Sequence, residues 1–273
     1  MFNPKLMLIT ASGNLGNSIH QYYENIIPIT RKELNLKNPN LDVLNQDFST
    51  CIISAALTNI DYCEQNKEEL HEIKMGTIKI IKKLDSLNKK IIFVSTDYVF
   101  DGIKGDYTEF DKPNPINQYG KSKSDIEFFI DFFVRNYLIV RIGKQFSYDK
   151  DKSNFIRDMI IEMKNGTTNV AYDQIMTPTL VDDTAKGIIR LIQNNNTGII
   201  HIANQSWNRL TLAKSIENKL NLSDTIHEIS IKSIGKAPRP LDTSLNCSKF
   251  KHMFPKFKFT PLEKSIERIL NET

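Results

Sequence analysis

Tyr119 and Lys123 lie four residues apart in the segment Tyr-Gly-Lys-Ser-Lys, so on a helix their side chains project from the same face. An ammonium beside a phenol favours the phenolate. We therefore expect Lys123 to lower the pKa of Tyr119, which makes the tyrosine a proton donor near neutral pH. Thr96 ends an apolar run, and its hydroxyl is expected at the same substrate oxygen. These side chains predict proton transfer at a carbonyl or carbinol while a cofactor carries hydride.

The context of this pair matters, because a Tyr-x-x-x-Lys spacing by itself also occurs on ordinary surface helices. The run 90–95 has the composition of a strand and places Thr96 at a strand end, where ligands bind in open α/β sheets. The chain also begins with an apolar run, 5–10, that leads into a glycine-containing turn. The three features together favour a dinucleotide-dependent enzyme.

The turn after the first apolar run is the expected cofactor-binding segment. Gly13 and Gly16 have the spacing of the last two glycines in a G-x-x-G-x-x-G turn, and Thr10 stands at the first glycine position in an ungapped comparison. Such a turn lets the backbone approach a pyrophosphate at a helix N-terminus, which favours negative charge. We expect the turn with Gly13 and Gly16 to approach the pyrophosphate. A tight strand-to-helix connection without a ligand is the alternative.

Arg31 follows the second strand-like run, 26–30, with Lys32 beside it. In a dinucleotide fold this strand end faces the adenosine ribose, where a carboxylate favours NAD and a cation accommodates the 2′-phosphate of NADP. No acidic residue ends this run, so the sequence favours NADPH, with NADH as the alternative cofactor. A polar surface loop is the simpler alternative for the two cations.

Strand-like and helical patterns alternate through the first half of the chain, which predicts a parallel sheet covered on both faces by helices. We expect an α/β fold, a Rossmann-type doubly wound parallel sheet with a smaller, discontinuous C-terminal substrate lobe. The dinucleotide-binding domain is expected over residues 1–145 plus about 175–205, and the lobe over about 146–174 plus 206–273. The expected strands are 5–10, 26–30, 51–55, 90–95, 137–142 and 198–203, and the expected helices are 14–24, 65–88, 119–134, 154–165, 181–193, 210–220 and 261–270.

Composition argues against several other classes of protein. The 273 residues are 40% hydrophobic and 25% charged with a net charge of +4, and the two signs are interspersed, so nucleic-acid binding is not predicted. No apolar run reaches the length of a membrane span, and the N-terminal residues do not resemble a signal peptide. Three cysteines at unrelated spacings suggest reduced thiols, and scattered single histidines predict no metal site. We expect a cytoplasmic protein.

Several motifs in a consistent order resemble the extended short-chain dehydrogenases/reductases, and most closely their dTDP-4-dehydrorhamnose reductase branch. The resemblance covers nearly the whole chain. Ser95–Gly102 matches the branch almost letter for letter, and Tyr119–Lys123 is similar to its catalytic pair. Further similarity lies in segments 11–16, 54–61, 154–155, 173–179 and 239–249.

This resemblance implies NADPH-dependent reduction of the 4-keto group of a nucleotide-activated 4-keto-6-deoxy sugar, in the biosynthesis of deoxysugar precursors. Tyr119 would protonate the C4 oxygen while NADPH delivers hydride to C4. Lys123 would hold the nicotinamide ribose hydroxyls and lower the tyrosine pKa, and Thr96 would orient the sugar oxygen. A homodimer is a family-level expectation.

The resemblance also implies which residues bind the two ligands. Asp97 and Tyr98 would border the sugar, and Arg239 would contact the diphosphate, because a guanidinium binds phosphate oxygens bidentately. Lys144 stands where we expect the branch to have a substrate-facing tryptophan. The implied cofactor-binding residues are Gly13, Asn14, Leu15, Gly16, Arg31, Ala55, Ala56, Thr58 and Lys123.

Four residues of the expected pocket depart from those usual in the branch: Thr10, Leu57, Lys144 and Met176. This pattern fits an altered sugar or nucleotide, and it leaves two alternatives open. One is an epimerase or dehydratase of the same superfamily, although dehydratases often have Asp-Glu after the threonine and this chain has Asp-Tyr. The other is a non-catalytic regulatory subunit that keeps the fold and binds a dinucleotide or a partner enzyme.

Overall fold

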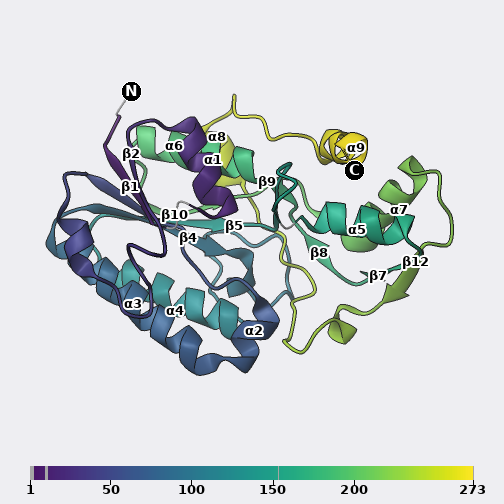
Figure 1. Ribbon diagram of the computed structural model, residues 1–273, viewed down its shortest axis with the longest axis horizontal. Coiled ribbons are helices and arrows are strands. Elements are labelled where there is room, and N and C mark those ends of the chain that lie inside the picture. The colour runs from purple at the N-terminus through teal and green to yellow at the C-terminus, as the bar shows by residue number, and fades with distance from the viewer. Residues whose placement is uncertain (1–2, 10–11, 153, 273) are drawn as a thin grey trace.

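The computed structural model describes residues 3–9, 12–152 and 154–272. Its centre is a parallel sheet of six strands in the order β10-β5-β4-β3-β1-β2 (Figure 1). The strands are β1 (Leu6–Ile9), β2 (Ile26–Ile29), β3 (Thr50–Ile53), β4 (Lys90–Thr96), β5 (Tyr137–Ile142) and β10 (Gly198–Ile202). Each corresponds to an expected strand with ends shifted by up to two residues. The predicted doubly wound parallel sheet is confirmed.

Side chains alternate between the two faces of the sheet, and both faces are buried. Leu6 and Leu8 of β1 join the hydrophobic cluster on one face, whereas Met7 and Ile9 join the cluster on the other. This is the two-residue period of a strand. Because both faces are covered, the strands are mostly apolar, and each face requires a layer of helices.

Helices α1 (Asn14–Tyr22) and α6 (Val181–Gln193) pack together on one face, and α3 (Lys67–Ser86) and α4 (Gln118–Phe133) on the other (Figure 1). The expected helix over 65–88 corresponds to α3, and a short helix that was not predicted, α2 (Ile60–Gln65), precedes it, separated from it by Asn66. The neighbours of β1 in the sheet are β2 and β3, on opposite sides. The carboxyl ends of β1 and β3 therefore border the crevice where such sheets bind ligands.

A smaller lobe lies at one end of the molecule (Figure 1). Helices α5 (Phe155–Lys164), α7 (Arg209–Lys219) and α9 (Leu262–Glu272) surround its own hydrophobic cluster, beside the parallel pair β7 (Thr168–Ala171) and β12 (Ile226–Ile229). Two shorter pairs join β6 (Gln145–Phe146) with β9 (Thr179–Leu180) and β8 (Ile175–Met176) with β11 (Trp207–Asn208). These short strands were not predicted, because a two-residue ladder carries no periodic pattern.

One C-terminal segment packs on the sheet before the chain enters α9. Helix α8 (Ser248–Met253) contacts β10, and its Phe250 is fully buried in the cluster on the α1/α6 face. The rings of Phe254, Phe257 and Phe259 surround Phe250 at centroid distances of 5.2, 5.0 and 6.0 Å. This aromatic cluster ties the last part of the chain to the central sheet.

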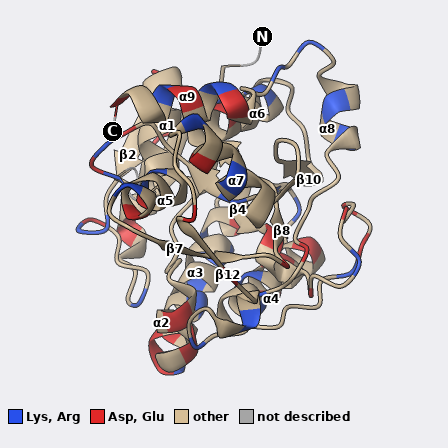
Figure 2. Ribbon diagram, turned by 90° about the vertical axis from the view of Figure 1, so that its right-hand side faces the viewer, with Lys and Arg blue, Asp and Glu red and all other residues tan. Residues whose placement is uncertain are grey.

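Within the described ranges, no helix is both long and apolar enough to cross a membrane. The same residues contain no group of three or more His, Cys, Asp or Glu side chains arranged to hold a metal ion. Acidic and basic side chains occur together on outer helices such as α9 (Figure 2). Cys51, Cys63 and Cys247 are buried free thiols.

Candidate active site

A cavity of about 450 Å³ brings together the expected catalytic residues and most of the expected binding residues. Thr96, Tyr119 and Lys123, the expected catalytic residues, all line it. Its walls also contain the predicted binding residues Gly13, Asn14, Leu15, Gly16, Ala56, Thr58, Asp97, Tyr98 and Lys144. Side chains from distant stretches of the sequence thus meet at the carboxyl edge of the sheet.

Thr96 is the last residue of β4 and the N-cap of a short 3₁₀ turn, Asp97–Val99. Its hydroxyl accepts a hydrogen bond from the Tyr98 N–H at 3.2 Å and donates to an Asp97 carboxylate oxygen at 3.0 Å. Threonine is among the residues favoured at such caps, because its oxygen pairs with an otherwise free N–H. The hydroxyl is therefore held in place at the edge of the cavity.

Tyr119 lies in the first turn of α4, after the N-cap Asn117. The Asn117 side chain accepts a hydrogen bond from the Gly120 N–H at 2.8 Å and donates one to the Pro238 carbonyl at 3.0 Å. A Cβ atom on Gly120 would lie 2.1 Å from the Tyr98 carbonyl oxygen, so this close approach requires glycine. The rings of Tyr98 and Tyr119 consequently meet edge to face, 6.2 Å between centroids.

The structure corrects the expected effect of Lys123 on Tyr119. Burial raises the pKa of Tyr119 well above its ordinary value, and the neighbouring Thr96 hydroxyl opposes this shift. The Lys123 ammonium donates to the Val94 carbonyl at 2.8 Å and lies 4.5 Å from the Phe93 ring centroid. The prediction of a lowered pKa was wrong, because helical spacing fixes the shared face but not the end point of a long side chain. The buried phenol keeps its proton at neutral pH.

Burial also lowers the pKa of Lys123 to about 8, and the Glu127 carboxylate partly opposes this shift. Loss of the ammonium proton removes the charge that is expected to hold the cofactor. We expect kcat/KM for NADPH to fall as the pH rises through about 8, because this parameter reports pKa values of the free enzyme. The Lys123→Arg variant, whose guanidinium stays charged, should lose the alkaline fall. A fall at the same pH in both proteins would contradict this assignment.

A buried ion pair anchors α4 to the sheet. The Glu127 carboxylate accepts hydrogen bonds from the Arg141 side chain of β5 at 2.7–3.1 Å, and the two side chains are only 4% and 2% exposed. The Arg141 guanidinium also lies 3.4 Å from the His201 ring. Burial, together with Arg141, lowers the pKa of His201 to about 3, so the imidazole is neutral and Glu127 alone balances the guanidinium. This pair fixes the orientation of the helix that carries Tyr119 and Lys123.

The expected cofactor residues line two cavities that share Ala56. The first is the 450 Å³ cavity described above, which the turn at the start of α1 lines. Gly13 is the N-cap of α1, and no described side chain caps this helix, which leaves the N–H groups of its first turn without a side-chain acceptor, as an anion site would require. The second cavity, of about 400 Å³, is lined by Arg31, Ala55 and Ala56. Thr10, the departure expected at this turn, lies outside the described residues.

Arg31 is exposed and faces the second cavity. Two other charged side chains line it, Lys37 and Glu69, and they pair with each other at 2.8 Å. The Glu33 carboxylate folds back onto the N–H and hydroxyl of Thr30, at 2.8 Å to each. Among the described residues of this wall, Arg31 is thus the charged side chain without an ion-pair partner.

Arg239 does not line the cavity where a substrate contact was expected. Its guanidinium donates to both carboxylate oxygens of Asp61 on α2, at 2.6 and 3.3 Å, and to two carbonyl oxygens of its own loop. The bidentate pair holds the pKa of Asp61 well below its ordinary value, with further hydrogen bonds from the backbone of residues 236 and 237. Arg239 therefore ties the loop 234–240 to α2.

Asp97 is 3% exposed, and one of its carboxylate oxygens has no hydrogen-bond partner in the described part of the chain. Burial raises its pKa to about 6, while hydrogen bonds with Thr243 and Thr96 and the charge of Lys144 oppose the shift. A buried polar atom without a partner is rare in proteins and calls for an explanation. The free oxygen fits a hydroxyl donor, such as that of a sugar.

Three residues around the site were not predicted from the sequence: Asp61, Glu127 and Arg209. Asp61 and Glu127 receive their roles from Arg239 and Arg141, which are distant in the sequence. A lone arginine inside the apolar strand 137–142 was the available signal for a buried partner. Arg209, the first residue of α7, donates to Gln174 at 3.1 Å, and no local pattern distinguishes it from a surface arginine.

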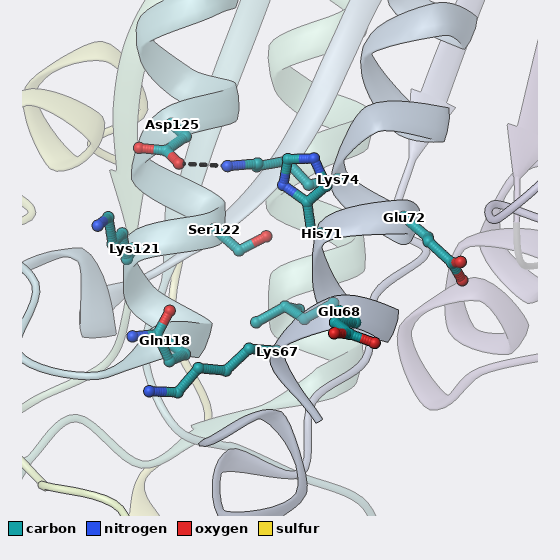
Figure 3. Close-up of a pocket in the computed structure, with 10 residues that line it drawn as sticks. Lys67, Glu68, His71, Glu72, Lys74, Gln118, Lys121, Ser122 and Asp125 are labelled. Carbon is teal, nitrogen blue, oxygen red and sulfur yellow. Dashed lines mark hydrogen bonds and ion pairs between the residues drawn. The ribbon is translucent and has the colours of Figure 1, made fainter. Parts of the chain in front are cut away.

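A larger cavity, of about 600 Å³, lies between α3 and α4 (Figure 3). All the residues that line it except Leu70 are polar or charged, and Lys74 and Asp125 form an ion pair across it at 2.7 Å. Gln118, Lys121 and Ser122 of α4 line it, whereas Tyr119 and Lys123 line the other cavity. None of the described residues predicted for catalysis or binding belongs to this groove, so volume alone does not identify the site.

Comparison with known proteins gives a consistent result over the whole chain. The sequence model of a family described as the RmlD substrate binding domain matches residues 4–273. A dTDP-4-dehydrorhamnose reductase of Aggregatibacter actinomycetemcomitans is 27% identical over 92% of this chain and 93% of that protein. Methionine adenosyltransferase 2 subunit beta of Xenopus laevis is 25% identical over 91% of this chain and 82% of that protein.

Among solved structures, dTDP-4-dehydrorhamnose reductase from Bacillus anthracis in complex with NADP has a TM-score of 0.86 and 28% identity, with 100% of each chain covered. The likeness therefore includes the lobe as well as the sheet.

Proposed function

Because this chain belongs to the RmlD substrate binding domain family, we propose that it reduces the 4-keto group of a nucleotide-activated 4-keto-6-deoxy sugar with NADPH, in deoxysugar biosynthesis. The observation that carries the proposal is that Thr96, Tyr119 and Lys123 line one cavity with the glycine turn of α1. A proton donor, an orienting hydroxyl and a phosphate-binding turn are the parts that hydride transfer to a carbonyl requires. The reductase from Bacillus anthracis, whose structure contains NADP, supports the choice of cofactor.

The residues present fit NADPH. The turn over 13–16 offers backbone N–H groups for the pyrophosphate, and the small side chains of Ala55 and Ala56 leave room along the groove. Arg31, which has no ion-pair partner among the residues that the structure describes, supplies a cation for the 2′-phosphate. When bound, the cofactor supplies the hydride that reaches C4.

The chain's own residues orient the sugar and move the proton. The Thr96 hydroxyl binds the C4 oxygen and places it beside Tyr119. As negative charge develops on that oxygen, the Tyr119 phenol transfers its proton to it. Lys123 holds the nicotinamide ribose, and the free carboxylate oxygen of Asp97 accepts a sugar hydroxyl. Because the phenol is protonated at neutral pH, the donor is in the required form before substrate binds.

The domain boundaries, the cellular location and the oligomeric state belong to the same proposal. Residues 1–145 plus about 175–205 form the dinucleotide-binding domain, and about 146–174 plus 206–273 form the substrate lobe. We infer a cytoplasmic homodimer from the resemblance, and sedimentation of the purified protein measures the oligomeric state.

Replacing Arg31 by Ala should weaken NADPH binding and leave NADH binding nearly unchanged. A hydrogen bond to a charged group contributes about 1.5–3 kcal/mol, which corresponds to about a 10- to 100-fold rise in KM for NADPH. KM for both cofactors is measured in the variant and in Lys32→Ala as the matched control. An equal loss for NADPH and NADH would show that Arg31 does not bind the 2′-phosphate.

The proposal is tested by oxidation of NADPH with dTDP-4-keto-6-deoxyhexose as the sugar substrate. Turnover that requires both ligands supports the reductase. Failure to oxidise NADPH with this sugar, under conditions where the protein binds the cofactor, would reject this sugar nucleotide as the substrate. Epimerisation or dehydration of a nucleotide sugar without net NADPH consumption would support the alternative chemistry.

A regulatory subunit is the second candidate function, and the similarity to methionine adenosyltransferase 2 subunit beta over 91% of this chain favours it. A subunit of this kind needs the fold and the dinucleotide groove but no proton donor. It would therefore bind NADPH without turnover, and it would change the activity of a partner enzyme whether or not Tyr119 carries its hydroxyl.

A further inference from the structure

We propose that Lys144 and Arg209 form an anion-binding pair that holds an anionic group of the nucleotide sugar between the sheet and the lobe. The inference rests on the proposed function, because it names residues of the same substrate cleft. The ligand chemistry is an oxyanion, and it has two sources on such a substrate: the diphosphate, or an acidic substituent on the sugar.

Lys144 extends from the end of β5 into the cavity. Ile142 pairs with Thr96 in the sheet, so the segment that carries Lys144 begins beside the proposed catalytic strand end. Its carbonyl accepts a hydrogen bond from the Thr179 N–H at 2.8 Å, which fixes the backbone. The ammonium lies 5.6 Å from the Phe155 ring centroid and, within the described residues, makes no hydrogen bond or ion pair.

Arg209 approaches the same place from the lobe. It is the first residue of α7, and its backbone N–H and one guanidinium nitrogen donate to Gln174 at 2.9 and 3.1 Å. The Nε atom is buried and has no hydrogen-bond partner among the described residues. A guanidinium presents several donors in a fixed fork that suits phosphate or carboxylate oxygens. The unused donors therefore mark a site for an anion.

Both cations border the segment 174–179, because the Lys144 carbonyl accepts a hydrogen bond from the Thr179 N–H at 2.8 Å and Gln174 accepts two from Arg209 at 2.9 and 3.1 Å. Burial lowers the pKa of Lys144, and the nearby positive charges of Arg209 and Arg239 lower it further. Burial likewise lowers the pKa of Arg209, which faces Tyr98. Arg239 is already neutralised by Asp61 at 2.6 Å. Lys144 and Arg209 thus remain as neighbouring cations without an ion pair in the described chain.

Nearby carboxylates favour the charged forms of Lys144 and Arg209 without pairing with them. Asp97 and Asp158 face Lys144, and Glu162 faces Arg209, but none of the three forms an ion pair with either cation in the described structure. Glu162 accepts a hydrogen bond from the Thr168 hydroxyl. Two close cations without bound counter-charges are costly in a cleft, and an anionic ligand removes this cost.

Binding of three thymidine nucleotides to the NADPH-loaded protein tests the pair. The ligands are dTDP, dTDP-glucose and dTDP-glucuronate, which separate the charge of the diphosphate from that of the sugar. The proteins are wild type, Lys144→Met, Arg209→Met, and Lys79→Met as a control that removes an exposed lysine from the outer helix α3. The corresponding uridine nucleotides are measured in parallel, so that a preference of the protein for uracil over thymine is detected.

If the diphosphate is the ligand, both cleft variants should weaken binding of all three nucleotides by about tenfold or more. If an acidic group on the sugar is the ligand, wild type should prefer the glucuronate, and the variants should lose that preference without losing dTDP. Either pattern supports the pair and identifies the source of the anion.

Cleft variants that bind every nucleotide as Lys79→Met does would overturn the inference, as would a wild-type protein that binds none of them. The same proteins test the proposed reductase activity independently of the anion-binding pair. NADPH oxidation with an unchanged KM for the sugar in Lys144→Met and Arg209→Met would preserve the reductase and reject the pair. Nucleotide binding that depends on both Lys144 and Arg209, without any turnover, would support the anion-binding pair and reject the reductase activity.

Discussion

The Tyr119→Phe variant should lose NADPH-dependent reduction, with kcat lowered by about 10²- to 10⁴-fold, the range typical of a lost general acid. The substitution removes one oxygen and keeps the ring, so the edge-to-face contact with Tyr98 remains. Cofactor affinity should stay near that of wild type, because the phenol is not among the expected cofactor-binding groups. Steady-state kinetics and NADPH titration of the same preparation measure both quantities.

A matched control for this prediction is Tyr98→Phe, which removes a hydroxyl from the neighbouring ring. We expect it to act mainly through KM for the sugar, since we propose that Tyr98 borders the sugar and that Tyr119 donates the proton. If Tyr119→Phe retained wild-type kcat, another group would have to supply the proton. A Tyr119→Phe protein that still changed the activity of a partner enzyme would support the regulatory candidate.

Removal of one partner of the Arg141–Glu127 pair should have the largest effect on stability. The Arg141→Met variant leaves Glu127 as a buried carboxylate without its hydrogen-bonded guanidinium partner, because both side chains are at most 4% exposed. The expected cost is about 3–5 kcal/mol in the free energy of unfolding. Urea unfolding of the variant and of wild type measures it.

The double variant Arg141→Met/Glu127→Leu is the control for this prediction. It removes both charges and fills the space with apolar atoms, so it should recover most of the stability that the single variant loses. A single variant that loses less than about 1 kcal/mol would contradict the account, because water would then have to reach Glu127. Comparing the single and double variants separates the cost of burying an unpaired Glu127 carboxylate from the cost of losing the Arg141–Glu127 contact itself.

The sheet, and the meeting of Thr96, Tyr119 and Lys123 in one cavity, could be predicted because their signals are local. The strands of the sheet are short, mostly apolar runs that contribute buried residues to the hydrophobic clusters on both faces. Thr96 follows directly from a strand end, and the glycine between Tyr119 and Lys123 permits the close approach of α4 to Tyr98. Local spacing therefore brought these residues to one cavity.

The electrostatics of the site could not be predicted in the same way. The pKa of Tyr119 depends on how deeply α4 is buried, and Lys123 finds the Val94 carbonyl through a flexible side chain. Arg239 was expected at the diphosphate, yet its partner is Asp61, 178 positions away in the chain. Such partners are set by tertiary packing, which neither residue type nor spacing reveals.

The measurement that tests the central claim most directly is transfer of deuterium from NADPH labelled at its transferable position to dTDP-4-keto-6-deoxyhexose. The account predicts deuterium at C4 of the sugar product in wild type and its loss in Tyr119→Phe. Product NMR locates the label. Oxidation of NADPH without deuterium at C4, or binding of both ligands with no transfer, would contradict the assignment of this chain as a 4-ketoreductase.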